Sequence, residues 1–358
     1  MKMFQRVILI TPSMSKGGAE TQLVKLALHL QANFSKVLII SLKPIDEFNG
    51  ELKKLGLNVL FLKSWPNHSI ANLIFIYKTI RKFRPDIVIA FMFIAIIFAR
   101  LFKLIFKFKL ISTIRISVIQ KKWYLPFKIT SGIDDAIVYN SFASKKNFEN
   151  KKLVKNFGII INNGITLPLL KQKRAFDNQN HQFIWICVAH FRWNKDYNTL
   201  FKAIALIKDR NFKINIIGEL NGETWPYKLI QDLKIQNHVN ILGFKQDIGN
   251  YLDQADAFVL SSFSEGMPNA ILEAMAHAKP IVVSSIDGNT ELITESKCGL
   301  LCQKQNEYAM AENMIKVMDM TTEERLYYGL NGRKYIESNF KEERVMGNWM
   351  SLINQIAN

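Results

Sequence analysis

The sequence predicts an α/β protein built from two doubly wound, Rossmann-like domains that face each other across a cleft. At 358 residues the chain is longer than one hydrophobic core usually serves. Short β-branched apolar runs alternate with longer stretches of helical periodicity along the whole chain. Strands that are apolar on both faces are typical of parallel sheets covered by helices on both sides.

The expected strands fall into two series separated by a polar region. They are residues 7–10, 37–41, 59–62, 87–91, 109–114, 136–139 and 158–161, then 183–188, 213–217, 239–242, 257–260 and 280–284. Asn162, Asn163 and Gly164 form a turn signal between the series, and residues 171–182 are polar without apolar periodicity. We therefore predict domains at 1–165 and 166–340, and a last helix at 341–358 that packs back on the first domain.

The net charge of +17 belongs to the first half of the chain. Residues 1–165 contain 26 Lys and Arg against 8 Asp and Glu, whereas residues 166–358 contain 21 against 22. A basic domain indicates a polyanionic partner, either nucleic acid or an anionic membrane surface. A composition of 49% hydrophobic and 22% charged residues excludes a disordered or collagen-like chain.

Residues 91–110 are apolar over the length of a bilayer-spanning helix. Charges in the second half of this segment argue against a span, because a charge near the bilayer centre is costly. Arg100, Lys103 and Lys107 are spaced to form one basic stripe on a helix. The pattern predicts either a helix lying in the membrane interface or a packed domain helix with a solvated edge.

The sequence contains no clear sign of a secretory leader, a set of disulfides or a metal site. The first apolar run is too short for a secretory leader, so none is expected. Cys187, Cys298 and Cys302 cannot form a disulfide framework and are expected to be buried thiols in a reducing cytosol. No cluster of His, Asp and Glu has ligand spacing, so we expect no metal.

Two loops have residues suited to phosphate. Gly17 and Gly18 follow the first strand and precede a helix, where backbone N–H groups and the helix dipole favour an anion. Arg192 and Lys195 follow a strand of the second series, where they could bind a diphosphate. The next strand likewise ends in a glycine, Gly218. The alternatives are a flexible turn for the first loop and a solvated charge pair for the second.

The strongest segment covers residues 261–275. A strand ends, a Gly-Pro loop turns, and a helix begins near Pro268, with Glu265 before the helix and Glu273 inside it. A carboxylate beside helix-start amides accepts hydrogen bonds from sugar hydroxyls, and the amides suit phosphate. Two carboxylates on one strand-helix unit do not show the opposed arrangement that a hydrolase needs.

This segment resembles the E-x7-E region of the retaining glycosyltransferases of family 4, which have the two-domain GT-B fold. The resemblance continues through residues 279–282 and 287–291 and extends over nearly the whole chain. Other matching motifs are Gly17-Gly18-Ala19-Glu20 for the glycine loop, Asn163-Gly164-Ile165 for the interdomain turn and Leu242-Gly243-Phe244 for the nucleotide-base loop. Several motifs in this order are far more specific than any one of them.

The resemblance implies retaining transfer from a UDP- or GDP-sugar without a metal or other cofactor. Glu265 would contact the donor sugar, Glu273 the ribose hydroxyls, and Arg192 and Lys195 the leaving diphosphate; Glu265, Lys195 and Arg192 are the implied catalytic residues. The implied donor-binding residues are Gly17, Gly18, Gly218, Leu242, Gly243, Gly266, Met267, Pro268, Asn269, Ala270 and Glu273.

Two positions depart from the family's pattern. Many members have an Arg where this chain has His190, and a His where it has Phe91. Residues 111–115 instead resemble the I-S-x-R variant of branches that build bacterial surface polysaccharides. This likeness places Arg115 on the acceptor or donor side of the N-terminal domain, with a structural ion pair as the alternative.

The resulting hypothesis is a cytoplasmic transferase that docks on the inner face of the cytoplasmic membrane. Its acceptor would be a lipid-linked saccharide in polysaccharide or lipopolysaccharide biosynthesis. The basic residues expected near anionic lipid are Arg81, Lys82, Arg84, Arg100, Lys103, Lys107, Lys121 and Lys122.

One alternative is a nucleic-acid-binding protein, although the basic residues of this chain are interleaved with apolar runs and no known nucleic-acid motif is present. The other is a catalytically inactive GT-B scaffold, which the departures at Phe91 and His190 allow.

Overall fold

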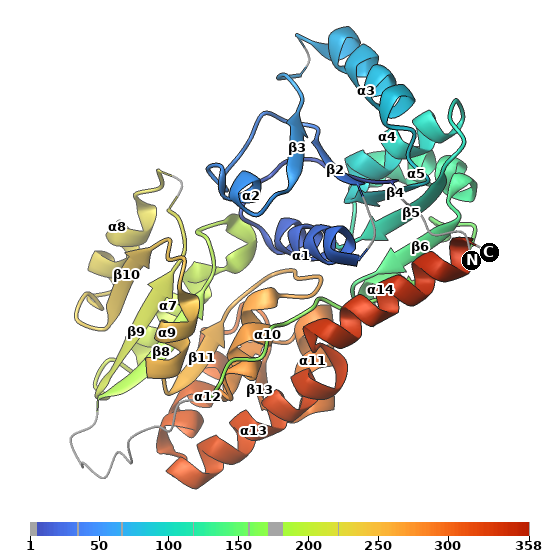
Figure 1. The fold of residues 1–358 in the computed structure, drawn as a ribbon. Coiled ribbons are helices and arrows are strands. Elements are labelled where there is room, and N and C mark those ends of the chain that lie inside the picture. Colours follow the sequence, from blue (N-terminus) through green and yellow to red (C-terminus); the bar gives the residue numbers. More distant parts are fainter. Residues whose placement is uncertain are drawn as a thin grey trace. The chain divides into compact units, whose positions relative to one another are not determined.

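A computed structural model describes residues 6–33, 36–65, 67–116, 118–156, 158–170, 182–220 and 222–357. The chain forms two compact units, each with its own parallel sheet (Figure 1). The first unit comprises Met1–Gly164 and Glu343–Asn358, and the second comprises Ile165–Glu342. Most of the polar stretch at 171–182 lies outside the described residues.

The sheet of the first unit has the order β3-β2-β1-β4-β5-β6-β7, with every neighbouring pair parallel. Its strands match the seven expected runs. They are β1 (Arg6–Thr11), β2 (Lys36–Ser41), β3 (Asn58–Phe61), β4 (Ile87–Phe91), β5 (Lys109–Ile114), β6 (Ala136–Tyr139) and β7 (Ile159–Ile160). The strand order reverses between β1 and β4, which makes this the switch point of a doubly wound sheet.

Helices cover both faces of this sheet. They are α1 (Gly18–Asn33), α2 (Glu51–Lys54), α3 (Ser69–Phe83), α4 (Phe93–Lys103), α5 (Tyr124–Thr130), α6 (Phe142–Asn150) and α14 (Glu342–Ala357), with 3-10 turns η1 (Lys121–Trp123) and η2 (Ser131–Ile133). One core joins α3 to α6 with the sheet, and a second joins α1 and α14 with the opposite face. Trp349 of α14 is fully buried, so the end of the chain completes the core of the first unit.

The sheet of the second unit has the order β10-β9-β8-β11-β12-β13 and is also parallel. Its strands are β8 (Phe183–Val188), β9 (Phe212–Ile217), β10 (Val239–Gly243), β11 (Ala257–Leu260), β12 (Ile281–Ser284) and β13 (Gly299–Cys302). Sequence periodicity missed β13, because a four-residue edge strand that begins with glycine and is half-buried gives little signal.

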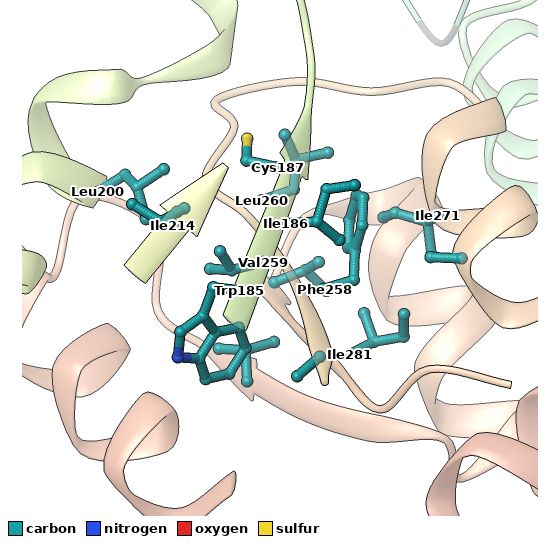
Figure 2. Packing of buried hydrophobic residues seen from close by; sticks show 14 of the residues in the cluster. Trp185, Ile186, Cys187, Leu200, Ile214, Phe258, Val259, Leu260, Ile271 and Ile281 are labelled. Carbon is teal, nitrogen blue, oxygen red and sulfur yellow. The ribbon is translucent and has the colours of Figure 1, made fainter. Parts of the chain in front are cut away.

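The helices of the second unit flank this sheet. They are η3 (Trp193–Lys195), α7 (Tyr197–Leu206), α8 (Trp225–Asp232), α9 (Ile248–Gln254), α10 (Asn269–Ala276), α11 (Asp287–Ser296), α12 (Glu307–Asp319) and α13 (Thr322–Asn339). Figure 2 shows how Trp185 and Ile186 of β8 pack beside Phe258 of β11, with Leu200 and Ile271 contributed by helices. This core fixes β8 against β11, whose loops carry the candidate site.

The three cysteines are buried in the second unit. Burial raises the pKa of the Cys187 and Cys298 thiols to about 12, and that of Cys302 to about 11. A thiol with such a pKa is uncharged at neutral pH and therefore a weak nucleophile. The three side chains are packing residues, as their sequence context predicts.

Helix α4 is a packed domain helix, and the predicted basic stripe is wrong. Arg100 is fully buried and forms a two-point ion pair with Asp134, through Nε to Oδ1 (2.9 Å) and Nη2 to Oδ2 (2.6 Å). Lys103 pairs with Asp135, and α4 ends before Lys107. Among the residues described, no helix combines the length and apolar composition needed to cross a bilayer.

Arg100→Met should destabilise the protein by about 3–5 kcal/mol, because it leaves the Asp134 carboxylate buried without its cation. Burial already raises the pKa of Asp134, and loss of the guanidinium should raise it further. A carboxyl whose folded pKa is raised favours folding at low pH, so the loss in stability relative to the wild type should grow as pH rises from the folded pKa of Asp134 in the wild type to its higher folded pKa in the variant. Denaturant unfolding at pH 5 and pH 8 checks this.

Arg81→Met is the matched control, since Arg81 is exposed on α3. It should change the free energy of unfolding by no more than about 0.5 kcal/mol. A loss for Arg100→Met that equals the control, or that is the same at both pH values, would contradict the assigned role of the pair.

Candidate functional site

Two loops meet at the carboxyl edge of the second sheet. One follows β8 and the other follows β11, and these strands are parallel neighbours at the switch point of the sheet. Ser261 Oγ donates to the carbonyl oxygens of Lys195 (3.1 Å) and Asp196 (2.9 Å). The backbone N–H of Phe263 donates to the carbonyl of Asn194 (2.9 Å). The two loops are therefore fixed to each other through backbone groups.

These contacts bring Lys195 and Glu265 together. The Lys195 ammonium donates to Glu265 Oε1, and the two side chains are 18% and 11% exposed. Ser262 Oγ donates to the same oxygen at 2.9 Å. Within the described part of the chain, Glu265 Oε2 makes no hydrogen bond, which leaves an acceptor beside a cation. Arg192 is exposed on the same loop, and the structure places Lys195, rather than Arg192, against Glu265.

The loop after Glu265 leads into α10, which begins at Asn269 with Pro268 as its N-cap. Met267 and Pro268 are buried, whereas Asn269 and Ala270 are half-buried at the helix start. The first-turn amides of a helix point out of its N-terminus and form an anion site there. Glu273 lies half-buried in the second turn of this helix.

A glycine of α11 supports this loop from behind. A Cβ on Gly288 would lie 2.2 Å from the carbonyl oxygen of Gly266, far inside van der Waals contact. The absence of a side chain at Gly288 therefore allows the loop to approach α11. Sequence reasoning gave no individual role to Gly288 or Ser262, because only their spatial neighbours reveal one.

The loop after β9 also depends on close approach. A Cβ on Gly218 would lie 2.0 Å from the carbonyl oxygen of Ala189, so only glycine fits between the ends of β8 and β9. The backbone N–H of Gly218 donates to the carbonyl of Gly243, which has a φ of 69°. His190 Nδ1 accepts the backbone N–H of Glu219 at 3.1 Å. His190 thus organises the neighbouring loop, and Leu242 lies half-buried beside Gly243.

In the first unit, the glycine loop follows β1 at the switch point and α1 begins at Gly18. The backbone N–H and the hydroxyl of Thr21 both donate to the carbonyl of Gly17, at 3.0 and 2.9 Å. The backbone N–H of Lys16 donates to Glu47 Oε2 at 2.7 Å. The loop is therefore tied to the loop after β2, and it presents the positive end of the α1 dipole.

Across the switch point, a strained residue follows β4. Met92 has φ 69° and ψ 160°, a backbone conformation that residues other than glycine rarely adopt. Its backbone N–H donates to the carbonyl of Thr113 on β5 at 3.1 Å. The strain lies directly after Phe91, where many family members have a histidine.

Arg115 faces the chain's own interdomain turn. It is 8% exposed, and burial lowers the pKa of its guanidinium to about 10. Nη1 donates to Asn163 Oδ1 at 2.5 Å, and the guanidinium lies over the Phe91 ring, 5.2 Å from its centre. Nε has no partner within the described residues. Its observed partner is thus a neutral amide and not the carboxylate of an ion pair.

Gln22 and Lys25 of α1 hold the last residue of the first unit's main segment. The Gln22 side chain accepts the Gly164 N–H (2.7 Å) and donates to the Gly164 carbonyl (3.0 Å). Lys25 Nζ donates to the same carbonyl at 3.0 Å. Sequence reasoning missed both residues, since their partner lies about 140 positions away.

The first two residues of the second unit, Ile165 and Thr166, are held by hydrogen bonds. Ile165 exchanges backbone hydrogen bonds with Phe340 (2.7 Å) and Glu342 (3.1 Å), and Thr166 Oγ1 donates to the Glu342 carboxylate at 2.6 Å. Each unit therefore fixes the chain up to its own side of the junction.

Two doubly wound parallel sheets with an E-x7-E helix start define the GT-B class of glycosyltransferases. The family description "Glycosyltransferase Family 4" matches residues 16–167, and "Glycosyl transferases group 1" matches residues 170–335. The chain belongs to glycosyltransferase family 4. Among the described residues, no group of three or more His, Cys, Asp and Glu side chains could hold a metal ion.

Known relatives share parts of the chain. An uncharacterized glycosyltransferase of Methanocaldococcus jannaschii is 26% identical over 64% of this chain and 62% of that protein. The Escherichia coli UDP-Gal:alpha-D-GlcNAc-diphosphoundecaprenol alpha-1,3-galactosyltransferase is 36% identical over 32% of this chain and 29% of that protein. The matched region thus spans less than two thirds of either relative.

The fold is shared with a solved structure over almost the full length. The crystal structure of Anabaena HepE in complex with UDP and glucose has a TM-score of 0.85 and covers 98% of this chain and 99% of that one. At 17% sequence identity this likeness shows the GT-B fold.

Gly288→Ala should displace the loop at Gly266 and destabilise the second unit by about 1–3 kcal/mol, because the new Cβ meets backbone that has little room to move. Amide hydrogen exchange of residues 262–267 should become faster. Gly347→Ala in α14 is the control, since a Cβ there has no neighbour within 4 Å. It should stabilise the protein by up to about 1 kcal/mol. Equal effects of the two changes would contradict the close-approach argument.

Proposed function

We propose that the protein transfers a sugar, with retention of configuration, from a UDP- or GDP-sugar to a lipid-linked saccharide. The observation that carries this proposal is the Lys195–Glu265 pair, fixed by Ser262 beside the N-terminus of α10. The E. coli relative is named for a UDP-sugar donor and a diphosphoundecaprenol-linked acceptor. That name supports a role in surface polysaccharide or lipopolysaccharide synthesis.

The donor would bind at the carboxyl edge of the second sheet. Lys195, Arg192 and the first amides of α10 face the diphosphate and stabilise the charge that it gains as it leaves. Glu273 accepts hydrogen bonds from the ribose hydroxyls. Glu265 Oε2 would accept a hydrogen bond from a hydroxyl of the donor sugar, while Oε1 accepts one from the Lys195 ammonium.

In the proposed transfer, the bond between the anomeric carbon and the phosphate oxygen breaks first. The acceptor hydroxyl forms the new bond on the same face of the sugar, and its proton passes to the leaving phosphate oxygen. Retention follows because the attacking and the leaving oxygen use one face. Glu265 would bind hydroxyls of the donor sugar and orient the sugar, while its pairing with Lys195 fixes the position of its side chain.

The acceptor would reach the first unit from a membrane. We define the docking face as the exposed apolar side chains on α3, after α4 and on α5, which are Ile70, Leu73, Ile74, Leu104, Ile105, Leu125 and Ile129. Tyr77 of α3 contacts Phe106, and Phe93 of α4 contacts Trp123, so the helices form one packed layer on one side of the sheet (Figure 1). Such a layer suits the inner face of the cytoplasmic membrane.

Exposed basic residues lie on or next to the segments that form the docking face, and such cations favour binding to anionic lipid. They are Lys78, Arg81, Lys82, Arg84, Lys107, Lys121, Lys122 and Lys128. Arg100, which sequence analysis placed here, is excluded by its burial against Asp134. The apolar residues between the cations favour a membrane over the backbone of a nucleic acid.

Lys195→Ala and Glu265→Ala should each lower the rate of nucleotide-sugar hydrolysis or transfer by at least about 100-fold, since each removes a contact to the reacting part of the donor. Thermal shift with UDP, GDP and their sugars identifies the donor first. Lys195→Ala should also lower the stabilisation by the free nucleotide, whereas Glu265→Ala should spare it.

Lys208→Ala and Glu323→Ala are the controls, because both residues are exposed on the second unit. Their rates should equal that of the wild type. No stabilisation of the wild type by any nucleotide would overturn the transferase proposal, and nucleotide binding without turnover would favour an inactive scaffold.

The double change Ile70→Asp/Ile74→Asp should abolish flotation with anionic vesicles, because it places two charges on the docking face, where these side chains are 74% and 49% exposed. The matched control is Leu326→Asp/Leu330→Asp on α13, with the same spacing and exposures of 52% and 43%. An equal loss in both variants would contradict the assignment of this face. Retention of the wild type on DNA at high salt would favour the nucleic-acid alternative.

A further inference from the structure

The first unit contains a cavity that the transferase proposal does not use. It has a volume of about 580 Å³ and lies between α3 and the strands β1, β2 and β3. The lining residues are Arg6, Lys36, Leu38, Asn58, Leu60, Phe75, Lys78, Thr79, Lys82 and Phe83. Arg6, Lys36 and Asn58 are the first residues of their strands, so the cavity lies at the amino edge of the sheet. Donor and acceptor sites of doubly wound sheets lie at the opposite, carboxyl edge.

Among the described residues that line this cavity, four are cations and none is a carboxylate. Arg6 Nη1 donates to the carbonyl of Phe83 at 3.1 Å, which fixes the guanidinium at the cavity wall. Among the described residues, the Lys36, Lys78 and Lys82 side chains form no ion pair. Asp86, the acidic residue nearest to Lys82 in sequence, accepts a hydrogen bond from the backbone N–H of Arg6 at 3.0 Å. Like charges gathered around one hollow raise its potential and attract an anion.

Apart from Asn58 and Thr79, the rest of the wall is apolar. Leu38 is 3% exposed, and Leu60, Phe75 and Phe83 line the cavity beside it. A free phosphate ion gains nothing from such a wall, whereas the glycerol and first methylene groups of a phospholipid bury apolar surface against it. The volume is also within the range of sites that hold a small organic ligand.

Helix α3 joins the cavity to the docking face. Phe75, Lys78 and Lys82 are three and four residues apart, so they share one side of the helix and line the cavity. Ile70 and Ile74 lie on the neighbouring side and belong to the docking face. A membrane that contacts the apolar side of α3 therefore brings its headgroups to the level of Lys78 and Lys82.

We propose that this cavity binds the phosphate headgroup of an anionic glycerophospholipid, with Arg6, Lys36, Lys78 and Lys82 around the phosphate and the glycerol against Leu38 and Leu60. The inference rests on the proposed membrane docking and names the lipid that the first unit recognises. It gives the enzyme a preference for anionic membranes that is separate from its acceptor site.

The direct test is lysine acylation, quantified by mass spectrometry, with dihexanoyl-phosphatidylglycerol kept below its micelle concentration. At ten times the Kd, bound lipid should slow acylation of Lys78 and Lys82 by about tenfold. Lys53 and Lys54, an exposed pair on α2 that does not line the cavity, serve as internal controls and should be unchanged. The absence of protection at Lys78 and Lys82 would overturn the proposal.

The same measurement separates other sources of phosphate. Inorganic phosphate and a DNA oligonucleotide at equal phosphate concentration should leave Lys78 and Lys82 reactive. Equal protection by inorganic phosphate would show a site for the free ion, and equal protection by DNA would show a nucleic-acid surface. Either result would overturn the lipid assignment.

Lys78→Ala/Lys82→Ala should lower partitioning onto phosphatidylglycerol vesicles by about 30-fold, from about 1 kcal/mol for each basic residue near anionic lipid. Partitioning onto phosphatidylcholine should not change, and Lys53→Ala/Lys54→Ala should have a smaller effect. Nucleotide stabilisation of the second unit should be unaffected. If lipid protects Lys78 and Lys82 but no nucleotide stabilises the protein, the transferase proposal alone is wrong. If a nucleotide stabilises the protein but lipid does not protect these lysines, the lipid proposal alone is wrong.

Discussion

The parallel pairing of β8 with β11 is the constraint on which the candidate site depends. These strands are far apart in sequence. They are neighbours because β9 and β10 lie on one side of β8 in the sheet, and β11, β12 and β13 lie on the other. Their loops then leave the same edge side by side, so Ser261 can bind the carbonyls of Lys195 and Asp196. The backbone bonds between the loops position Lys195 against Glu265 within the candidate site.

The basic surplus of the first unit divides into three physical classes. Arg100 and Arg115 are buried and hold the structure together, one through Asp134 and the other through Asn163. Lys103 is paired on the surface with Asp135. A third class is exposed without an ion pair among the described residues, and it includes Lys36, Lys78 and Lys82, which line the amino-edge cavity. Net charge therefore overstates the surface potential, because cations buried in pairs do not contribute to an attraction for lipid.

Much of the fold and part of the site could be predicted from the sequence. Every expected strand is present, because a strand buried on both faces needs a continuous apolar run that is visible locally. The approximate positions of Lys195 and Glu265 at strand ends were equally visible. The half-buried edge strand β13 was not, since only its pairing with β12 stabilises it. Ser262, Gly288 and Gln22 were missed because their roles consist of contacts with distant segments.

The sequence by itself determined the alternation of strands and helices, the family motifs and the uneven charge, since each depends on residues near one another in the chain. Only the tertiary structure decided which side chains are buried. Arg100 belongs to a pattern typical of an interfacial helix, yet its partner lies 34 residues away and removes it from solvent. Arg115 likewise meets Asn163 across 48 positions. Burial and ion pairing arise from long-range packing. The local pattern of the sequence does not identify the distant residue with which a charged side chain will pair.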